Sequence, residues 1–229
     1  MIAVRPSEAR GPADHGWLQS RHSFSFGSYY DPGHMGVSAL RVINDDKVAP
    51  GAGFAPHSHQ DMEIISYVKK GMIEHKDSMG NTERLPPGEF QLMTAGTGVT
   101  HSEYNPSNTE GLEFLQIWIQ PNVLGIEPGY QQKRFDPQPG LQLIASPDAR
   151  DGSLRLHQDA SLYRLWLQTD EAAGHALAAQ RTAYLHVVSG AIEVNGETLG
   201  EGDGATVSDV AEIHFSALQE SEALLFDLP

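Results

Sequence analysis

The chain has 229 residues with 39% hydrophobic side chains, which is enough apolar material for a folded core in one large or two small domains. Its 30 acidic and 15 basic residues give a formal charge of −15, which argues against direct nucleic-acid binding because such proteins need a basic face. The chain contains no cysteine, so disulfides, thiolate metal ligands and a cysteine nucleophile are all excluded.

Short runs of β-branched and aromatic residues, separated by turns rich in glycine and proline, recur along the whole chain. These runs are found at residues 39–43, 63–68, 114–119, 162–167, 184–188 and 192–194. Segments of this length and composition predict strands, and no long stretch has the period of an amphipathic helix. We therefore expect an all-β fold, in the form of a sandwich or of small barrels.

Two tripeptides in the first half place metal-binding side chain types at positions i and i+2. They are His57-Ser58-His59 and His101-Ser102-Glu103. Alternate residues of a strand share one face. If the two tripeptides are strands that face one another, three imidazoles and one carboxylate converge. This set of donors suits a divalent transition metal with one or two open coordination positions.

The spacing does not decide which carboxylate is the fourth ligand, and it predicts structural roles for several other side chains. Glu63 lies four residues after His59, so strand parity puts it on the ligand face in competition with Glu103. The carboxylate that does not bind could support a ligand or act as a general base. We expect His75 at the surface or in a supporting role, and Trp118 in the core or a pocket wall.

The second half repeats the pattern of the first without its histidines. The turn at residues 200–204 resembles the one at residues 87–89, and strand signals flank both turns. The chain therefore looks like two copies of one β module. Residues 121–140 differ in composition, being rich in Pro, Gly and Gln, and we expect an inter-domain connection there with room for one short helix.

Residues 53–71 resemble the first motif of the cupin superfamily, and residues 88–105 resemble the second. More narrowly, the run from Met93 through His101-Ser102-Glu103 is similar to the pirin family, as are residues 23–27, 44–46 and 116–118. This resemblance implies a bicupin, with two small antiparallel β-barrels of the double-stranded β-helix type in one chain. We expect a metal-binding barrel at residues 1–125, a linker at 126–140 and a barrel without ligands at 141–229.

The resemblance also implies the metal ligands. In pirins they are two histidines of the first motif and a histidine and a glutamate of the second, which correspond here to His57, His59, His101 and Glu103. By analogy Glu103 is favoured over Glu63. Iron is the usual metal, so we expect Fe(II), with Mn, Ni, Cu, Co or Zn as alternatives. Because histidines bind metals only when neutral, we expect loss of the metal below about pH 6.

Bacterial pirin-like proteins act as quercetin 2,3-dioxygenases, so the resemblance implies an enzyme of that kind. It would open the central ring of a flavonol such as quercetin with O₂. Glu103, or Glu63 in its place, would take the enol proton as catalytic base. Phe54, Met93 and Trp118 are candidates for an apolar pocket wall. The animal relative is an iron-dependent transcriptional cofactor, so the alternative is a non-enzymatic, metal-dependent regulator that binds a protein partner.

Two further features of the sequence concern location. The first six residues hold too short an apolar run for a signal peptide. No unbroken apolar span of about 20 residues is present, so we expect no membrane-spanning helix. We therefore expect a cytoplasmic protein with no membrane partner.

Overall fold

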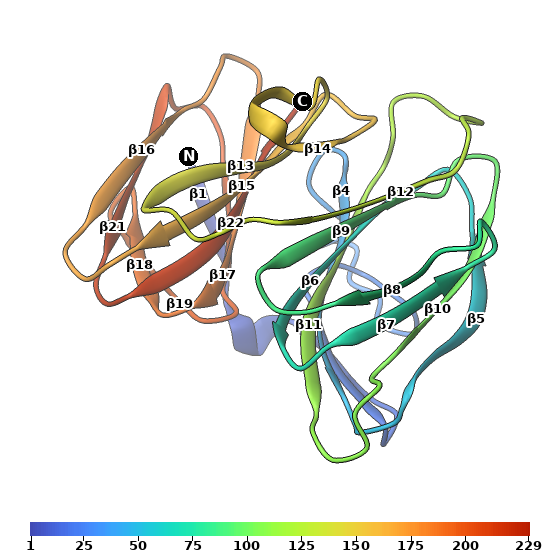
Figure 1. Cartoon of the computed structure of the whole chain (residues 1–229). Coiled ribbons are helices and arrows are strands. Elements are labelled where there is room, and N and C mark those ends of the chain that lie inside the picture. Colours follow the sequence, from blue (N-terminus) through green and yellow to red (C-terminus); the bar gives the residue numbers. More distant parts are fainter. The chain divides into compact units, whose positions relative to one another are not determined.

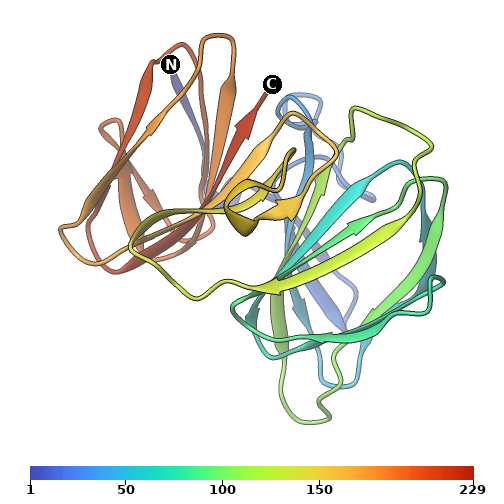
Figure 2. The same ribbon diagram turned by 45° about the horizontal axis from the view of Figure 1, so that its top comes forward.

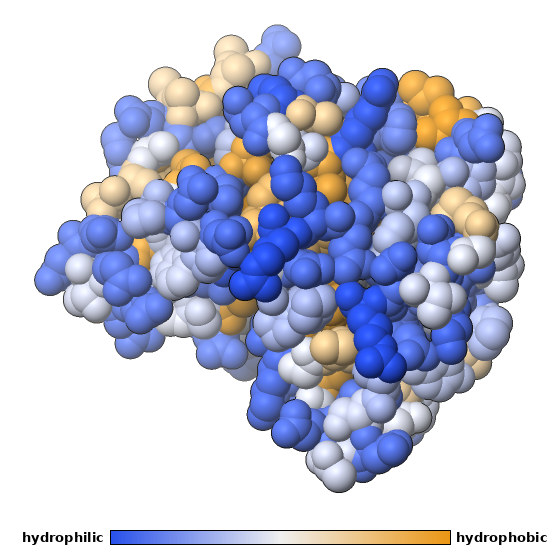
Figure 3. All heavy atoms as spheres, viewed as in Figure 1, coloured by the Kyte–Doolittle hydropathy of each residue, from blue (hydrophilic) through white to orange (hydrophobic).

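The computed structural model describes all residues, Met1–Pro229, and is built almost entirely of strands (Figures 1 and 2). Its helical segments are two short 3₁₀ helices, η1 (Ser7–Ala9) and η2 (Arg150–Gly152). No helix has the length and hydropathy needed to span a bilayer. Polar side chains cover most of the face seen in Figure 3, in keeping with the formal charge of −15. The all-β prediction is confirmed.

The chain divides into two compact units. The N-terminal unit consists of Gly11–Gly36 and Leu40–Asp136. The C-terminal unit consists of Met1–Arg10, Val37–Ala39 and Pro137–Pro229. Each unit contains one seven-stranded and one four-stranded sheet.

The N-terminal unit has the strand orders β12-β9-β6-β11-β4-β3-β2 and β5-β10-β7-β8, and the paired strands are antiparallel. Its strands are β2 (Gly11–Asp14), β3 (Leu18–His22), β4 (Leu40–Val48), β5 (Gly53–His59), β6 (Glu63–Lys70), β7 (Ile73–Asp77), β8 (Thr82–Leu85), β9 (Glu89–Thr94), β10 (Val99–Tyr104), β11 (Leu112–Ile119) and β12 (Gly129–Arg134). The β5–β10 pair carries both predicted ligand tripeptides.

The C-terminal unit has the strand orders β1-β20-β17-β22-β15-β13-β14 and β16-β21-β18-β19. Its strands are β1 (Ile2–Arg5), β13 (Gly140–Ser146), β14 (Leu154–Arg155), β15 (Ser161–Leu167), β16 (Ala172–Ala176), β17 (Thr182–Ser189), β18 (Ala191–Val194), β19 (Glu197–Gly200), β20 (Gly204–Val207), β21 (Glu212–Ala217) and β22 (Ser221–Leu228). One pair, β13 with β14, is parallel.

The interiors of the two units differ in chemistry. A large cluster of buried apolar side chains, among them Leu185, Ile213 and Leu225, fills the C-terminal unit. The N-terminal unit has smaller apolar clusters, and it also buries many polar side chains, including Asn44, Asp46, Glu63, Ser66, His75, Gln91, His101, Glu103 and Gln116. Buried polar groups need partners or a function, so the interior of the N-terminal unit is where a site belongs.

The structure differs from the predicted domain boundaries at two places. Residues 2–5, placed in the domain 1–125 from sequence, form β1 and pair with β20 in the C-terminal unit. The predicted linker 126–140 contains no helix and instead holds β12, which pairs with β9. Both strands lie at the edge of a sheet and bury little surface. An edge strand of this kind needs no strong apolar alternation, so its sequence gives little signal.

Candidate metal centre

The two predicted ligand tripeptides lie on neighbouring antiparallel strands, β5 and β10. His57 stands opposite His101 in the register. A β-bulge then places Glu103 opposite Phe54. Gly53 permits this close pairing, because a Cβ on it would lie 2.3 Å from the Glu103 carbonyl oxygen. The tripeptides are therefore adjacent in one sheet rather than on facing strands, and they still bring the predicted side chains together.

Three imidazoles converge at this point. The ring centroids are 4.8 Å apart for His57 and His59, 4.5 Å for His57 and His101, and 4.9 Å for His59 and His101. Their candidate ligand nitrogens all lie within 4.8 Å of one another. His57 Nδ1 donates to the Ala55 carbonyl at 2.8 Å, which leaves Nε2 for a metal. His101 is buried and neither of its ring nitrogens has a hydrogen-bond partner, which fits a metal-binding role.

Glu103 adds a carboxylate on another side of His101. Its candidate ligand oxygen lies within 4.8 Å of those of His101 and His75. The Ser66 hydroxyl donates to Glu103 Oε1 at 3.1 Å, while Oε2 is buried without a partner. His101 thus links two overlapping groups of donors, and the four predicted ligands gather around it. Nitrogen and oxygen donors of this kind fit a divalent transition metal.

Burial favours the neutral form of His59 and His101. The pKa of His59 is lowered to about 4 and that of His101 to about 3, mainly by burial, and the neighbouring imidazoles contribute to both shifts. A neutral imidazole is the form that binds a metal. At neutral pH these two histidines can therefore bind an ion without first losing a proton.

The metal-free protein is expected to lose stability as pH falls from about 6.5 towards 4. In that range the unfolded chain takes up protons that the buried His59 and His101 cannot, so protonation favours unfolding. The midpoint of urea unfolding, measured against pH, tests this, and the slope should be shallower in His101→Ala. In the metal-loaded protein, elemental analysis should show that the metal is retained below about pH 6. The pH at which the metal is lost is therefore lower than the sequence predicted. If stability changed with pH equally in the wild type and in His101→Ala, the lowered pKa assigned to His101 would be contradicted.

His75 and Asp77 form a buried pair that the sequence did not predict. We expected His75 at the surface or in a supporting role, but its side chain and that of Asp77 are fully buried and joined at 3.0 Å from Nε2 to Oδ2. The His75 ring centroid lies 5.3 Å from that of His101. The surface position is therefore wrong and the supporting role stays a prediction. The His-x-Asp spacing, which repeats the i, i+2 pattern of the ligands, was the available signal.

Asp77→Ala is expected to lower the free energy of unfolding by about 2–4 kcal/mol, because the buried His75 and three further donors lose one shared acceptor. Asp77 accepts hydrogen bonds from the Met79 and Asn81 amides, the Asn81 side chain and His75. Urea unfolding measures the change. Asp136→Ala, which removes a carboxylate that is 81% exposed, is the matched control and should change stability by less than about 0.5 kcal/mol. Equal effects would contradict the role of Asp77.

Glu63 is not brought to the ligands. It is fully buried on β6, accepts a hydrogen bond from Thr94 Oγ1 at 3.2 Å, and belongs to neither group of candidate donors. The parity argument fails because β5 ends at His59. A turn follows in which Asp61 has a φ of +48°, so the alternation does not continue into β6.

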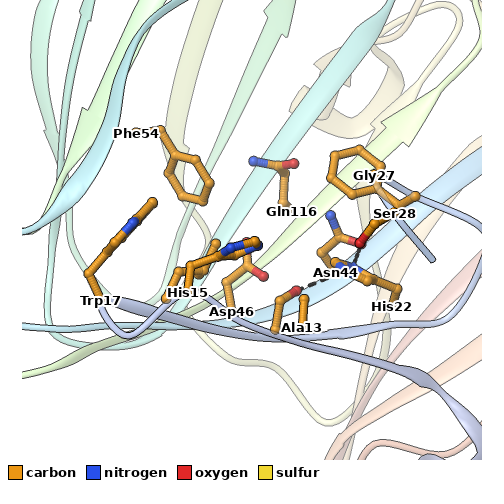
Figure 4. A pocket seen from close by; sticks show the side chains of 13 residues that line it. Ala13, His15, Trp17, His22, Gly27, Ser28, Asn44, Asp46, Phe54 and Gln116 are labelled. Atoms are coloured by element: carbon orange, nitrogen blue, oxygen red, sulfur yellow. Dashed lines mark hydrogen bonds between the residues drawn. The ribbon is translucent and has the colours of Figure 1, made fainter.

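A cavity of about 460 Å³, shown in Figure 4, reaches the neighbourhood of the imidazoles through Phe54. Phe54 is in its wall, and the Phe54 ring centroid is 6.3 Å from that of His57. Phe26, also in the wall, packs edge-on against Trp118 at 5.3 Å, and Trp118 packs edge-on against His59 at 5.0 Å. Trp118 lines a second cavity of about 380 Å³, whereas Met93 is fully buried in a core cluster.

Two family models cover nearly the whole chain. The model described as Pirin matches residues 3–119. The chain belongs to the pirin family. A second model, described as the quercetinase C-terminal cupin domain, matches residues 143–228 of this pirin. The bicupin prediction is confirmed.

Named relatives resemble this pirin along its full length. It is 55% identical over 229 residues to a quercetin 2,3-dioxygenase from Escherichia coli strain K12, and the match covers 100% of this chain and 99% of the relative. The crystal structure of YhhW from E. coli superimposes with a TM-score of 0.99 at 55% identity, covering 100% and 98% of the two chains. The structure of bacterial pirin YhhW in complex with nickel(II) gives a TM-score of 0.98 at 54% identity, covering 100% and 99%. These likenesses place the pirin among metal-dependent cupin enzymes.

Proposed function

We propose that this pirin is a metal-dependent dioxygenase that opens the central ring of a flavonol such as quercetin with O₂. The observation that carries the proposal is the convergence of three imidazoles, with the Glu103 carboxylate close to one of them, beside a cavity whose wall includes aromatic rings. The 55% identity to a quercetin 2,3-dioxygenase supports the choice of substrate. A cavity of about 460 Å³ is within the range used by small-molecule sites.

We propose His57, His59, His101 and Glu103 as the ligands of one divalent transition metal, with Fe(II) as the expected ion and Mn, Ni, Cu, Co or Zn as alternatives. The partnerless ring nitrogens of His101 support this set. A divalent metal held there would act as a Lewis acid towards substrate oxygens and as a path for electrons to O₂.

We propose Glu103 as the catalytic base. The Ser66 hydroxyl holds one of its carboxyl oxygens, and the other is buried without a partner. That second oxygen can take the enol proton of the flavonol, which makes the substrate electron-rich enough to react with O₂. Phe54 and Phe26 would bind the flat ring system and keep water from it.

Reconstitution of metal-free protein tests the function. The protein is stripped with a chelator, loaded separately with Fe(II), Mn(II), Ni(II) or Cu(II), and mixed with quercetin in air. We expect loss of the quercetin absorbance together with O₂ consumption for at least one metal, and none for the stripped protein. No turnover with any metal would overturn the enzyme and favour the metal-dependent regulator.

A further inference from the structure

Asp46 is a buried carboxyl group with an unused oxygen. It lies on β4 with 2% of its surface exposed and lines the cavity of about 460 Å³. Ser20 supplies one side-chain hydrogen bond, whereas Asp46 Oδ1 is buried and has no partner. A buried acceptor left unpaired costs free energy. The position of this unpaired oxygen in a cavity wall indicates that its hydrogen-bond donor belongs to a bound ligand.

No lysine or arginine lines the cavity beside this carboxyl. Lys69 Nζ pairs at 2.6 Å with Asp45, whose side chain points to the other face of β4 because adjacent strand residues alternate. His22 Nδ1 faces Asn44 Oδ1 at 2.7 Å and the Ser20 hydroxyl at 3.3 Å. The pKa of Asp46 is raised to about 7, mainly by burial, and the charges of Asp45 and Glu103 contribute to the rise.

The cavity sets this polar group against aromatic rings. Trp17 and Phe54 pack edge-to-face at 5.2 Å on one side, and Figure 4 shows Asp46 and Gln116 between Phe54 and the loop with Gly27. Gln116 on β11 lies opposite Asn44 on β4 in the register. The space therefore suits a flat aromatic molecule with polar substituents on its edge.

We propose that Asp46 is a specificity-determining residue that accepts a hydrogen bond from a phenolic hydroxyl of the substrate. The inference rests on the proposed function and narrows its substrate class to flat polyphenols. The hydroxyl is not the reacting enol, because Asp46 belongs to neither group of metal-binding donors. A ligand without this hydroxyl leaves the buried Asp46 Oδ1 unpaired, and a site of this kind rejects such a ligand strongly.

The test compares flavonols that differ only in their hydroxyl groups. One series carries two, one or no hydroxyls on the pendant ring, and a further compound lacks those of the fused ring. For the metal-loaded wild type we expect kcat/KM to be about 10- to 100-fold higher for the compound that carries the hydroxyl bound by Asp46 than for the compound that lacks only this hydroxyl. Asp46→Ala should lose this preference through KM. Asp46→Asn, which retains an acceptor oxygen and the shape of the side chain, should keep part of it.

Controls separate this inference from the function on which it rests. Asp45→Asn removes a neighbouring carboxylate outside the cavity and should leave the preference unchanged, and elemental analysis should show equal metal content in all variants. Anaerobic fluorescence titration measures the same preference as a ratio of Kd values without turnover. Absence of turnover in the wild type would overturn the proposed function alone. An unchanged preference in Asp46→Ala, or in Asp46→Asn should the alanine variant not fold, would overturn the role of Asp46.

Discussion

His101→Ala is expected to abolish stoichiometric metal binding and to lower kcat/KM for quercetin by at least about 100-fold. His101 belongs to both groups of candidate donors, so its loss leaves neither group complete. Its two buried nitrogens have no other partner that could explain their place in the protein. Elemental analysis of the purified variant and a quercetin absorbance assay measure the two effects.

The matched control for this substitution is His214→Ala. His214 lies on β21 in the C-terminal unit, and its side chain is 69% exposed. Its replacement should change neither metal content nor turnover. Full metal occupancy in His101→Ala would show that the ion binds elsewhere, and the assignment of the centre would be wrong.

Glu103→Gln is expected to lower kcat by about 100-fold or more, because it removes the proton acceptor while keeping the size of the side chain. The glutamine oxygen can still accept from Ser66, so the fold around β10 should persist. Metal content should fall less than in His101→Ala, since three imidazoles remain. Steady-state kinetics with parallel metal analysis separates loss of the base from loss of the ion.

Glu63→Gln tests which of the two carboxylates, Glu63 or Glu103, acts at the site. Glu63 is as buried as Glu103 but lies outside both groups of donors. Its substitution should leave kcat within about threefold, because no transition-state interaction is removed. A larger loss in Glu63→Gln than in Glu103→Gln would exchange the roles of the two carboxylates.

The sequence predicts features that depend on neighbours along the chain, and the histidine pairs are of that kind. Strand parity within residues 57–59 and 101–103 is local, and the structure brings these side chains together. The same parity failed for Glu63, because a turn with Asp61 in the left-handed region separates it from β5. Parity is reliable within one strand and not across a turn.

Features that depend on the register between distant strands were not predictable. His75 approaches His101 because β7 pairs with β10, where Glu103 lies opposite His75. Asp46 enters the cavity because β4 lies between β3 and β11. A hydrogen-bond register of this kind leaves no mark on the spacing of residues. The edge strands β1 and β12 were missed for a different reason, because they bury little surface and lack a strong apolar alternation.

The place of β1 has a consequence for synthesis on the ribosome. Its partner residues, 204–207, emerge roughly 200 residues after it. At typical elongation rates the first strand waits on the order of 10–40 s before its sheet exists. The histidine-bearing barrel can close during that interval, while the leading peptide remains unpaired. A tag or deletion at the amino end would therefore disturb the barrel completed last, and leave the one completed first intact.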